Sequence, residues 1–268
     1  FIRRKEDLGD SESDFDKLHD WKAGTPIGGG ILIIFITTVL YLLTVFFFRA
    51  EWQSFCIFKF LDEVHIMLLT FLGFGMLGLY DDWVKIFGKP EKSRFGYRFG
   101  ISERTKFVLQ WILGLLIGTF LYFNLGLDFI HIPLTSVVLH MGLFFIPFAA
   151  FILVLFSNAY NVTDGLDGLS SGLLLIALIT FMIISSSALD MALSSFIALW
   201  VGGLIAFLYF NVYPARIWLG DAGALAFGAM LGLIGLLTGK ILALFLIGGI
   251  YLVEVSSSFI QMFVLKYF

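Results

Sequence analysis

Long apolar stretches separated by short polar segments repeat along the whole chain. Each apolar stretch is long enough to cross the roughly 30 Å hydrocarbon core of a bilayer as a helix. The pattern predicts eight membrane helices, at about residues 28–48, 64–80, 107–124, 137–156, 170–188, 193–210, 222–238 and 241–265. We therefore expect an all-α fold, a polytopic membrane helical bundle, organised as a single integral-membrane domain over residues 1–268.

The composition excludes a soluble globular domain. Hydrophobic residues make up 59% of the chain and charged residues 14%, and the mean hydropathy is +0.96. The single cysteine, Cys56, excludes an internal disulfide. The net charge of −3 indicates little by itself, because the distribution of charge along a membrane protein matters more than its sum.

Basic residues are distributed unequally between the two sides of the predicted bundle. One set of segments carries 14 Lys and Arg residues, and the opposite side carries only three. The basic segments are 1–27, 81–106, 211–221 and the C-terminal end. The positive-inside rule places these segments in the cytoplasm. We expect residues 83–106 to form a cytoplasmic loop near the lipid headgroups.

The most informative polar segment, residues 157–169, follows an apolar run. Asn158, Asn161, Asp164 and Asp167 recur at every third residue, which keeps them roughly on one side of a helical or tight-turn backbone. Polar groups at membrane depth are costly, so they are candidates for function. The alternative is a polar helix end, where Asn and Asp cap a turn.

Two further acidic motifs fall on the same predicted face. Asp81 and Asp82 are expected at the C-terminal end of the second helix, where the macrodipole disfavours negative charge, and Lys85 is an i+4 partner for Asp81. Asp221 precedes an apolar helix. Oxygen-only acidic groups suit a hard cation such as Mg²⁺. A surface ion pair for Asp81 and an ordinary N-cap for Asp221 remain the alternatives.

Basic and glycine residues border these motifs. Lys22, Lys85, Arg104 and Lys106 would suit an anionic, phosphate-bearing ligand. The glycine run 28–30 permits either close approach of a ligand to the backbone or close helix packing.

Taken together, the motifs resemble one family, the polyprenyl-phosphate N-acetylhexosamine-1-phosphate transferases. The shared motifs, in order, are Lys22-x-Gly-Thr-Pro, Asp81-Asp-x-x-Lys, Asn161-x-Thr-Asp-Gly-Leu-Asp-Gly-Leu, Gly220-Asp-x-Gly, and a helix with Glu254, Ser256 and Gln261. The first and third favour the phospho-N-acetylmuramoyl-pentapeptide transferase branch. The chain departs from the family pattern at Ile27–Gly30, at Ala224 and at Trp218, where the family has a uracil-stacking Phe. The branch's histidine-rich loop would follow Phe268, so we expect a chain truncated at both ends and about ten membrane helices in the full protein.

The resemblance implies an enzyme of peptidoglycan synthesis in the bacterial cytoplasmic (inner) membrane. It would transfer phospho-MurNAc-pentapeptide from UDP-MurNAc-pentapeptide to undecaprenyl phosphate, giving lipid I and UMP, with Mg²⁺ as cofactor. Membrane lipids would be partners, nucleic acid would not, and a homodimer is left open. The implied catalytic residues are Asp81, Asp82 and Asp221, with Asp221 as metal ligand, and the implied substrate-binding residues are Lys22, Lys85, Lys106, Asn161, Asp164, Asp167, Asn211, Trp218 and Gln261.

Several alternatives stay open at this point. A sister enzyme that transfers GlcNAc-1-phosphate to a lipid carrier would share the fold and the metal chemistry. A transporter would need acids along a path through the membrane, whereas here they gather on one face. Trp218 could be an interfacial anchor. The dianionic lipid phosphate favours direct attack over a covalent phospho-aspartate intermediate.

Overall fold

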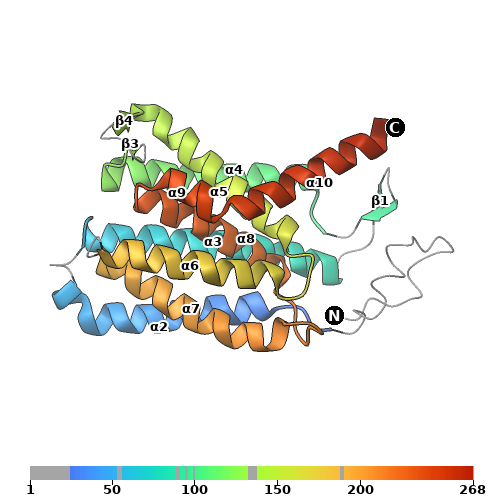
Figure 1. Cartoon of the computed structure of the whole chain (residues 1–268), viewed down its shortest axis with the longest axis horizontal. Coiled ribbons are helices and arrows are strands. Elements are labelled where there is room, and N and C mark those ends of the chain that lie inside the picture. Colours follow the sequence, from blue (N-terminus) through green and yellow to red (C-terminus); the bar gives the residue numbers. More distant parts are fainter. Residues whose placement is uncertain are drawn as a thin grey trace.

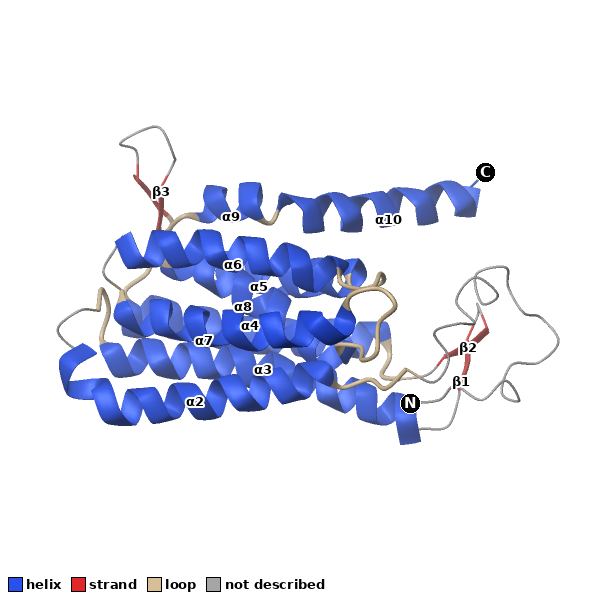
Figure 2. Ribbon diagram, turned by 60° about the horizontal axis from the view of Figure 1, so that its bottom comes forward, coloured by secondary structure: helices blue, strands red, loops and turns tan. Residues whose placement is uncertain are grey.

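The computed structural model describes residues 25–52, 56–87, 91–93, 96–98, 100–131, 138–187 and 190–267. Its helices run roughly side by side and form one bundle (Figures 1 and 2). The helices are α2 (Gly29–Trp52), α3 (Phe60–Phe87), α4 (Glu103–Leu125), the 3-10 turn η4 (Gly142–Phe144), α5 (Phe145–Thr163), α6 (Leu169–Ser187), α7 (Met191–Asn211), α8 (Gly220–Leu237), α9 (Ile241–Ile247) and α10 (Gly249–Tyr267). Two short antiparallel hairpins complete the described part, β1 (Glu91–Ser93) with β2 (Gly96–Arg98), and β3 (Phe129–His131) with β4 (Val138–His140).

The expectation of a polytopic helical membrane protein is confirmed. Within the described residues, seven helices are long and apolar enough to cross a membrane, or eight if α9 and α10 count as one bent span. The outer helices point large apolar side chains outward. On α2, for example, Phe35, Phe46 and Phe47 are 64%, 78% and 71% exposed, which is the arrangement expected of a surface in contact with lipid.

Helix α8 is the centre of the bundle, and 89% of its 18 residues are buried. It packs most extensively against α3 and α5. Glycines allow this approach, because a Cβ on Gly78 of α3 would overlap the carbonyl oxygen of Asp221, and a Cβ on Gly228 of α8 would overlap that of Phe156. Residue Asp221, at the start of α8, is thereby held against the α3 backbone.

An aromatic cluster fills the core between α3, α7 and α8. The rings of Phe71 and Phe227 stack at 5.9 Å between centroids, and Trp200 makes an edge contact with each of them. All three side chains are fully buried. This cluster fixes the lateral order of the helices whose ends carry the candidate site.

The predicted eighth helix, 241–265, is wrong as a single element. The chain bends by 66° between α9 and α10. The bend lies at Gly248. A Cβ at this position would come 2.6 Å from Cε1 of Phe156, so only a residue without a side chain lets the backbone pass this close to α5.

Two other predicted boundaries are also wrong. The fourth helix, predicted from 137, begins at Phe145, because residues 138–140 pair with 129–131 as a β-hairpin. The predicted loop 83–106 is shorter, because α3 continues to Phe87 and α4 already begins at Glu103. Asp81 and Asp82 therefore lie more than one turn inside α3, away from the unpaired carbonyls of its C-terminus.

Candidate active site at the α3–α4–α8 end of the bundle

Four side chains from three helices form a compact cluster of ion pairs. The Oδ2 atom of Asp221 lies 2.6 Å from Nζ of Lys85 and 2.7 Å from Nζ of Lys106. Both ammonium groups also lie 2.9 Å from Oδ2 of Asp81. We call Asp81, Lys85, Lys106 and Asp221 the ionic cluster. Two carboxylates and two ammonium groups balance their charges there, which offsets the cost of removing them from water.

The members of the ionic cluster differ in exposure. The side chains of Asp81 and Lys106 are 3% and 7% exposed, whereas those of Asp221 and Lys85 are 19% and 38% exposed. Oδ1 of Asp81 also accepts a hydrogen bond of 2.8 Å from the backbone N–H of Ile101. Asp81 and Lys106 therefore form the buried part of the cluster, and Asp221 and Lys85 form the part that a ligand can reach.

Asp82 holds the start of α8 in place. Its two carboxylate oxygens accept hydrogen bonds from the backbone N–H groups of Asp221 (3.2 Å) and Ala222 (3.0 Å). The alternative interpretation of Asp221 as the N-cap of α8 is therefore wrong. The preceding Leu219 provides no side-chain cap, and the carboxylate of Asp82 supplies it from α3. Gly220, at φ 82°, turns the chain into α8 directly above Asp82.

This arrangement makes a prediction for Asp82. Asp82→Ala should cost about 0.5–2 kcal/mol of stability, as the loss of a helix cap does, and should lower transfer activity because Asp221 loses its fixed position. Asp82→Asn keeps one acceptor oxygen and should lie between the wild type and Ala. Thermal unfolding and turnover of the three proteins, measured in one detergent, would check this; equal melting temperatures would refute the capping role.

Helix α4 presents Lys106 from a well-defined N-terminus. Ser102 is the N-cap, and its Oγ accepts a 3.0 Å hydrogen bond from the backbone N–H of Thr105. One turn after Lys106, the buried Gln110 accepts a 2.6 Å hydrogen bond from Nδ2 of Asn158 on α5. Sequence reasoning missed Gln110. The available signal was an amide side chain four residues after Lys106 in an otherwise apolar helix.

The Asn/Asp segment forms a second polar group, between the end of α5 and the start of α6. Asp164 accepts a short hydrogen bond from the hydroxyl of Ser170, and Oδ2 of Asp167 accepts one of 3.0 Å from the backbone N–H of Ala215. Asn211 accepts from the N–H of Gly168 and donates to the carbonyl of Ile217, both at 3.0 Å. The loop after α5 is therefore joined to the loop between α7 and α8.

Trp218 belongs to the same α7–α8 loop. Its backbone forms a short parallel bridge with Ile27, in which its carbonyl accepts from Gly28 (3.1 Å) and Gly29 (2.9 Å). A Cβ on Gly30 would overlap the backbone of Gly223. The glycine run 28–30 thus allows the start of α2 to pack closely against the start of α8. Of its two interpretations, close helix packing is the one that the structure supports.

The remaining predicted site residues are placed differently. Asn161 lies half-buried on the last turn of α5. Gln261 is exposed on α10, where it donates to Ser257 of the same helix at 3.3 Å, and α10 extends beyond the bundle (Figure 2). The structure does not bring Gln261 into contact with the ionic cluster. Lys22 lies outside the described residues.

The donor atoms fit the hard cation that the resemblance implies. The acidic side chains at this end, Asp81, Asp82 and Asp221, offer only oxygen, which Mg²⁺ prefers, and Mg²⁺ typically uses one or two carboxylates and substrate phosphates. Both oxygens of Asp81 and of Asp82 already accept hydrogen bonds or ion pairs. Asp221, the most accessible carboxylate of the ionic cluster, is therefore the residue best placed to hold such an ion.

Comparison with known proteins shows the family of this chain. A family model described as glycosyl transferase family 4 matches residues 64–239, which include the whole ionic cluster. The chain is 36% identical over 250 residues to the phospho-N-acetylmuramoyl-pentapeptide-transferase of Listeria monocytogenes serovar 1/2a, covering 93% of this chain and 72% of that protein. It is 34% identical over 258 residues to the protein of the same name from Caldanaerobacter subterraneus subsp. tengcongensis, covering 95% and 74%. The chain therefore belongs to the phospho-N-acetylmuramoyl-pentapeptide transferase family within glycosyl transferase family 4.

Proposed function

We propose that this protein transfers phospho-MurNAc-pentapeptide from UDP-MurNAc-pentapeptide to undecaprenyl phosphate, with lipid I and UMP as products. The observation that carries the proposal is the ionic cluster, which places two lysines and two carboxylates at one end of a membrane bundle in a member of this family. One substrate is a lipid phosphate and the other a nucleotide pyrophosphate. A charged site at the membrane edge can hold both.

The main barrier to this reaction is electrostatic. The acceptor phosphate monoester has a second pKa of about 6, so it is mostly dianionic at neutral pH and needs little help to become a nucleophile. It must approach a pyrophosphate that is itself negative. The side chain of Lys85 is 38% exposed, so its ammonium group can exchange a carboxylate partner for a substrate phosphate, while buried Lys106 keeps a second positive charge next to Asp81 and Asp221.

The bonding changes follow from this arrangement. An oxygen of the lipid phosphate attacks the sugar-bearing phosphorus of the donor, the new P–O bond forms, and the bond to the bridging oxygen breaks to release UMP. Mg²⁺, when bound, supplies further stabilisation of charge on the pyrophosphate oxygens. We propose that Asp221 holds it.

Direct attack is favoured over a covalent phospho-aspartate intermediate. A nucleophilic carboxylate needs an accessible oxygen, but Asp81 is 2% exposed and pairs with both lysines and a backbone N–H. Both carboxylate oxygens of Asp82 accept hydrogen bonds from backbone N–H groups at the start of α8. We therefore assign both residues to positioning: Asp81 orients the lysines, and Asp82 fixes Asp221.

We propose that the donor nucleoside binds at the two joined loops, the one after α5 and the one between α7 and α8. These loops carry Asp164, Asp167, Asn211 and Trp218. Their mutual hydrogen bonds make a preorganised surface beside the start of α8. Asn161, Lys22 and Gln261 remain predicted contacts of the substrates. The chain is a multi-pass membrane protein, and we propose the bacterial cytoplasmic membrane as its location, with this end in the cytoplasm.

Trp218 provides a test of the donor pocket. If its ring stacks on the uracil base, Trp218→Ala should weaken binding of a uridine nucleoside inhibitor by about 0.5–1.5 kcal/mol, whereas Trp218→Phe should retain most of the affinity. Calorimetric titration of the three proteins would measure this. Unchanged affinity in the Ala variant would return Trp218 to the role of an interfacial anchor.

The reaction itself can be tested with the full-length protein in detergent or bilayer. UMP release from UDP-MurNAc-pentapeptide should require both undecaprenyl phosphate and Mg²⁺, chelation should stop it, and added Mg²⁺ should restore it. Release of UMP without the lipid acceptor would indicate hydrolysis or a covalent intermediate instead of direct transfer.

A further inference from the structure

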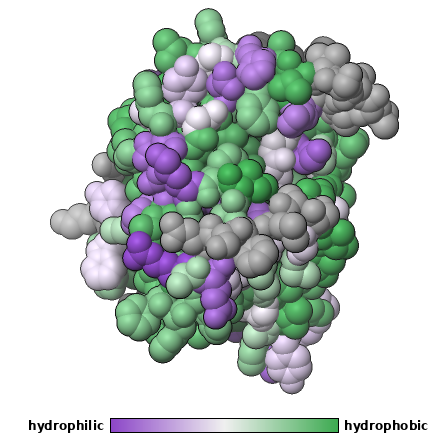
Figure 3. Space-filling model, turned by 90° about the vertical axis from the view of Figure 1, so that its left-hand side faces the viewer, coloured by the Kyte–Doolittle hydropathy of each residue, from purple (hydrophilic) through white to green (hydrophobic). Residues whose placement is uncertain are grey.

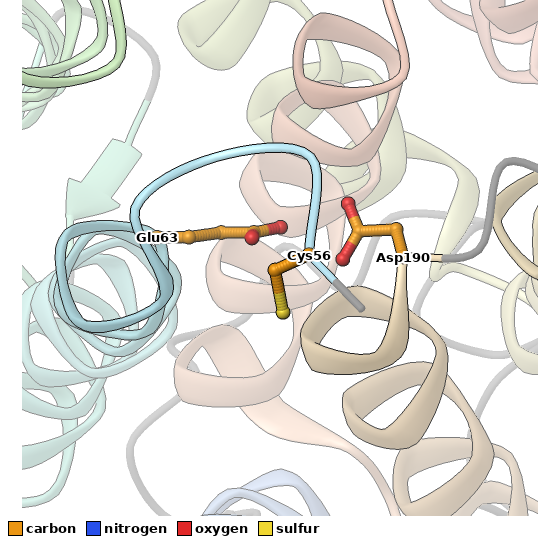
Figure 4. Close-up of side chains that lie close together, drawn as sticks. All are labelled: Cys56, Glu63 and Asp190. Atoms are coloured by element: carbon orange, nitrogen blue, oxygen red, sulfur yellow. The ribbon is translucent and has the colours of Figure 1, made fainter. Parts of the chain in front are cut away.

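A second group of reactive side chains lies at the other end of the bundle. It consists of Cys56, in the segment between α2 and α3, Glu63, in the first turn of α3, and Asp190, the N-cap residue of α7 (Figure 4). Glu63 and Asp81 are 18 positions apart on the same helix, which at 1.5 Å per residue separates the two sites by about 27 Å. Seen from this end, the surface mixes hydrophilic patches with hydrophobic side chains (Figure 3).

The two carboxyl groups of this site are buried without a cationic partner. Glu63 is 0% and Asp190 2% exposed. Within the part of the chain that the structure describes, no donor group reaches either side-chain oxygen of Glu63, and the Asp190 carboxyl can bond to it only through a shared proton. The ion pairs of the described residues involve Asp81, Asp128 and Asp221, and none of them includes Glu63 or Asp190. A buried carboxyl group in this situation is costly unless it binds a proton or a metal ion.

The ligand atoms of the three side chains lie close together. The Glu63 carboxylate extends toward Cys56 and Asp190 (Figure 4), and one sulfur and one oxygen from each carboxylate all lie within 4.8 Å of one another. Tetrahedral Zn²⁺, with bonds of about 2.3 Å to sulfur and 2.1 Å to oxygen, would bring such atoms to about 3.6 Å. Oδ1 of Asp190 accepts a 3.3 Å hydrogen bond from the N–H of Leu193, which leaves Oδ2 for a ligand bond.

We propose that Cys56, Glu63 and Asp190 form a Zn²⁺ site, with water as the fourth ligand. A thiolate among the ligands selects Zn²⁺ over Mg²⁺ or Ca²⁺, which take oxygen ligands. The ion would connect the segment before α3 to the start of α7, on the side of the membrane opposite the ionic cluster. Nothing in the transfer reaction requires this site.

Access and charge are both suitable. A cavity of about 290 Å³ reaches the site at Asp190 and is also lined by Ser185, Thr238 and Lys240, so it offers space for the water ligand beside that carboxylate. Three anionic ligands exceed the charge of Zn²⁺ by one. Lys240 on the cavity wall and the positive N-terminal ends of α3 and α7 offset that excess.

Binding requires the thiol to lose its proton to solvent. The Sγ of Cys56 now donates to the carbonyl of Trp52 at 3.2 Å, and burial raises the pKa of this thiol to about 11. The metal must therefore displace the proton, as it does at other cysteine sites.

Cobalt is the most informative probe, because its charge-transfer band reports a thiolate ligand and Cys56 is the only cysteine in residues 1–268. Full-length protein without a histidine tag, stripped with a chelator, should gain a thiolate-to-cobalt absorption band that saturates at about one equivalent of thiolate-bound Co²⁺, with the visible bands of tetrahedral Co²⁺. Zn²⁺ should displace the cobalt and raise the melting temperature.

The variants Cys56→Ser, Glu63→Gln and Asp190→Asn should each weaken Zn²⁺ binding by tenfold or more and lose the thermal shift, because loss of a ligand should cost at least as much as the roughly 10–100-fold lost with an outer-shell partner. Asp62→Asn, a change of a neighbouring acid on the same turn, is the matched control and should keep both. Cys56→Ser should retain Mg²⁺-dependent UMP release, so the outcome is separate from the proposed function.

Two results would overturn the proposal. One is wild-type protein that gains neither a thiolate band with Co²⁺ nor a thermal shift with Zn²⁺, which would mean that Glu63 and Asp190 share a proton instead. The other is a Zn²⁺-induced thermal shift that survives in both Cys56→Ser and Asp190→Asn, which would show that the stabilising ion lies elsewhere. The wild-type spectrum decides the question even if Glu63→Gln fails to fold.

Discussion

Asp221→Asn should reduce transfer by about 10²–10³-fold or more, while the protein stays folded and inserted in the membrane. The substitution keeps the size of the side chain but removes the negative charge that Lys85 and Lys106 share, and it removes the carboxylate best placed to hold Mg²⁺. Raising the Mg²⁺ concentration should recover little of the lost rate. Initial rates of UMP release across a Mg²⁺ titration would measure the effect.

Asp128→Asn is a suitable control for this experiment. Asp128 pairs with His140 at the β3–β4 end, away from the ionic cluster, so its loss should leave the rate unchanged. Near-normal turnover of Asp221→Asn at ordinary Mg²⁺ would remove Asp221 from the metal site and would require another ligand.

Lys106→Met should have the largest effect on stability. Lys106 is the more buried of the two lysines, and it contacts both Asp81 and Asp221. Without its ammonium group, the only cation left beside the buried Asp81 among the described residues is the more exposed Lys85. Removing one partner of a buried ion pair typically costs about 3–5 kcal/mol. We expect a clear drop in melting temperature together with nearly complete loss of transfer.

Lys85→Met provides a matched comparison, because Lys85 makes the same two contacts from a side chain that is 38% exposed. Its stability loss should be much smaller, since exposed ion pairs contribute about 0–1 kcal/mol, but its effect on rate should still be large. If Lys106→Met and Lys85→Met lower the melting temperature equally, burial is not what distinguishes the two lysines.

The parts of this site that sequence could predict are local or carried by motifs. The i, i+4 spacing of Asp81 and Lys85 predicted their pairing, and the structure confirms it at 2.9 Å. Hydropathy and charge distribution predicted which loops would meet at one end, because membrane topology leaves few alternatives. The predicted roles of these residues in catalysis await the experiments above.

The parts that sequence could not predict depend on long-range packing. The hydrogen bonds that Asp82 accepts from the start of α8 span 139 and 140 positions in the sequence and exist because Gly78 lets the two backbones approach. Hydropathy continues across Gly248, so the hydropathy pattern did not indicate the break between α9 and α10, although the adjacent Gly248 and Gly249 were a local signal for it. The apolar residues of β4 equally suited a helix, and only their pairing with β3 decided otherwise.

Donor discrimination by the full-length protein tests the central claim most directly. With undecaprenyl phosphate and Mg²⁺ present, kcat/KM for UDP-MurNAc-pentapeptide should greatly exceed kcat/KM for UDP-GlcNAc, because a site built for the lactyl-peptide arm gains binding energy that the smaller sugar cannot supply. The account predicts lipid I and UMP from the muramoyl donor and little product from the other. Efficient turnover of UDP-GlcNAc with none of UDP-MurNAc-pentapeptide would contradict it.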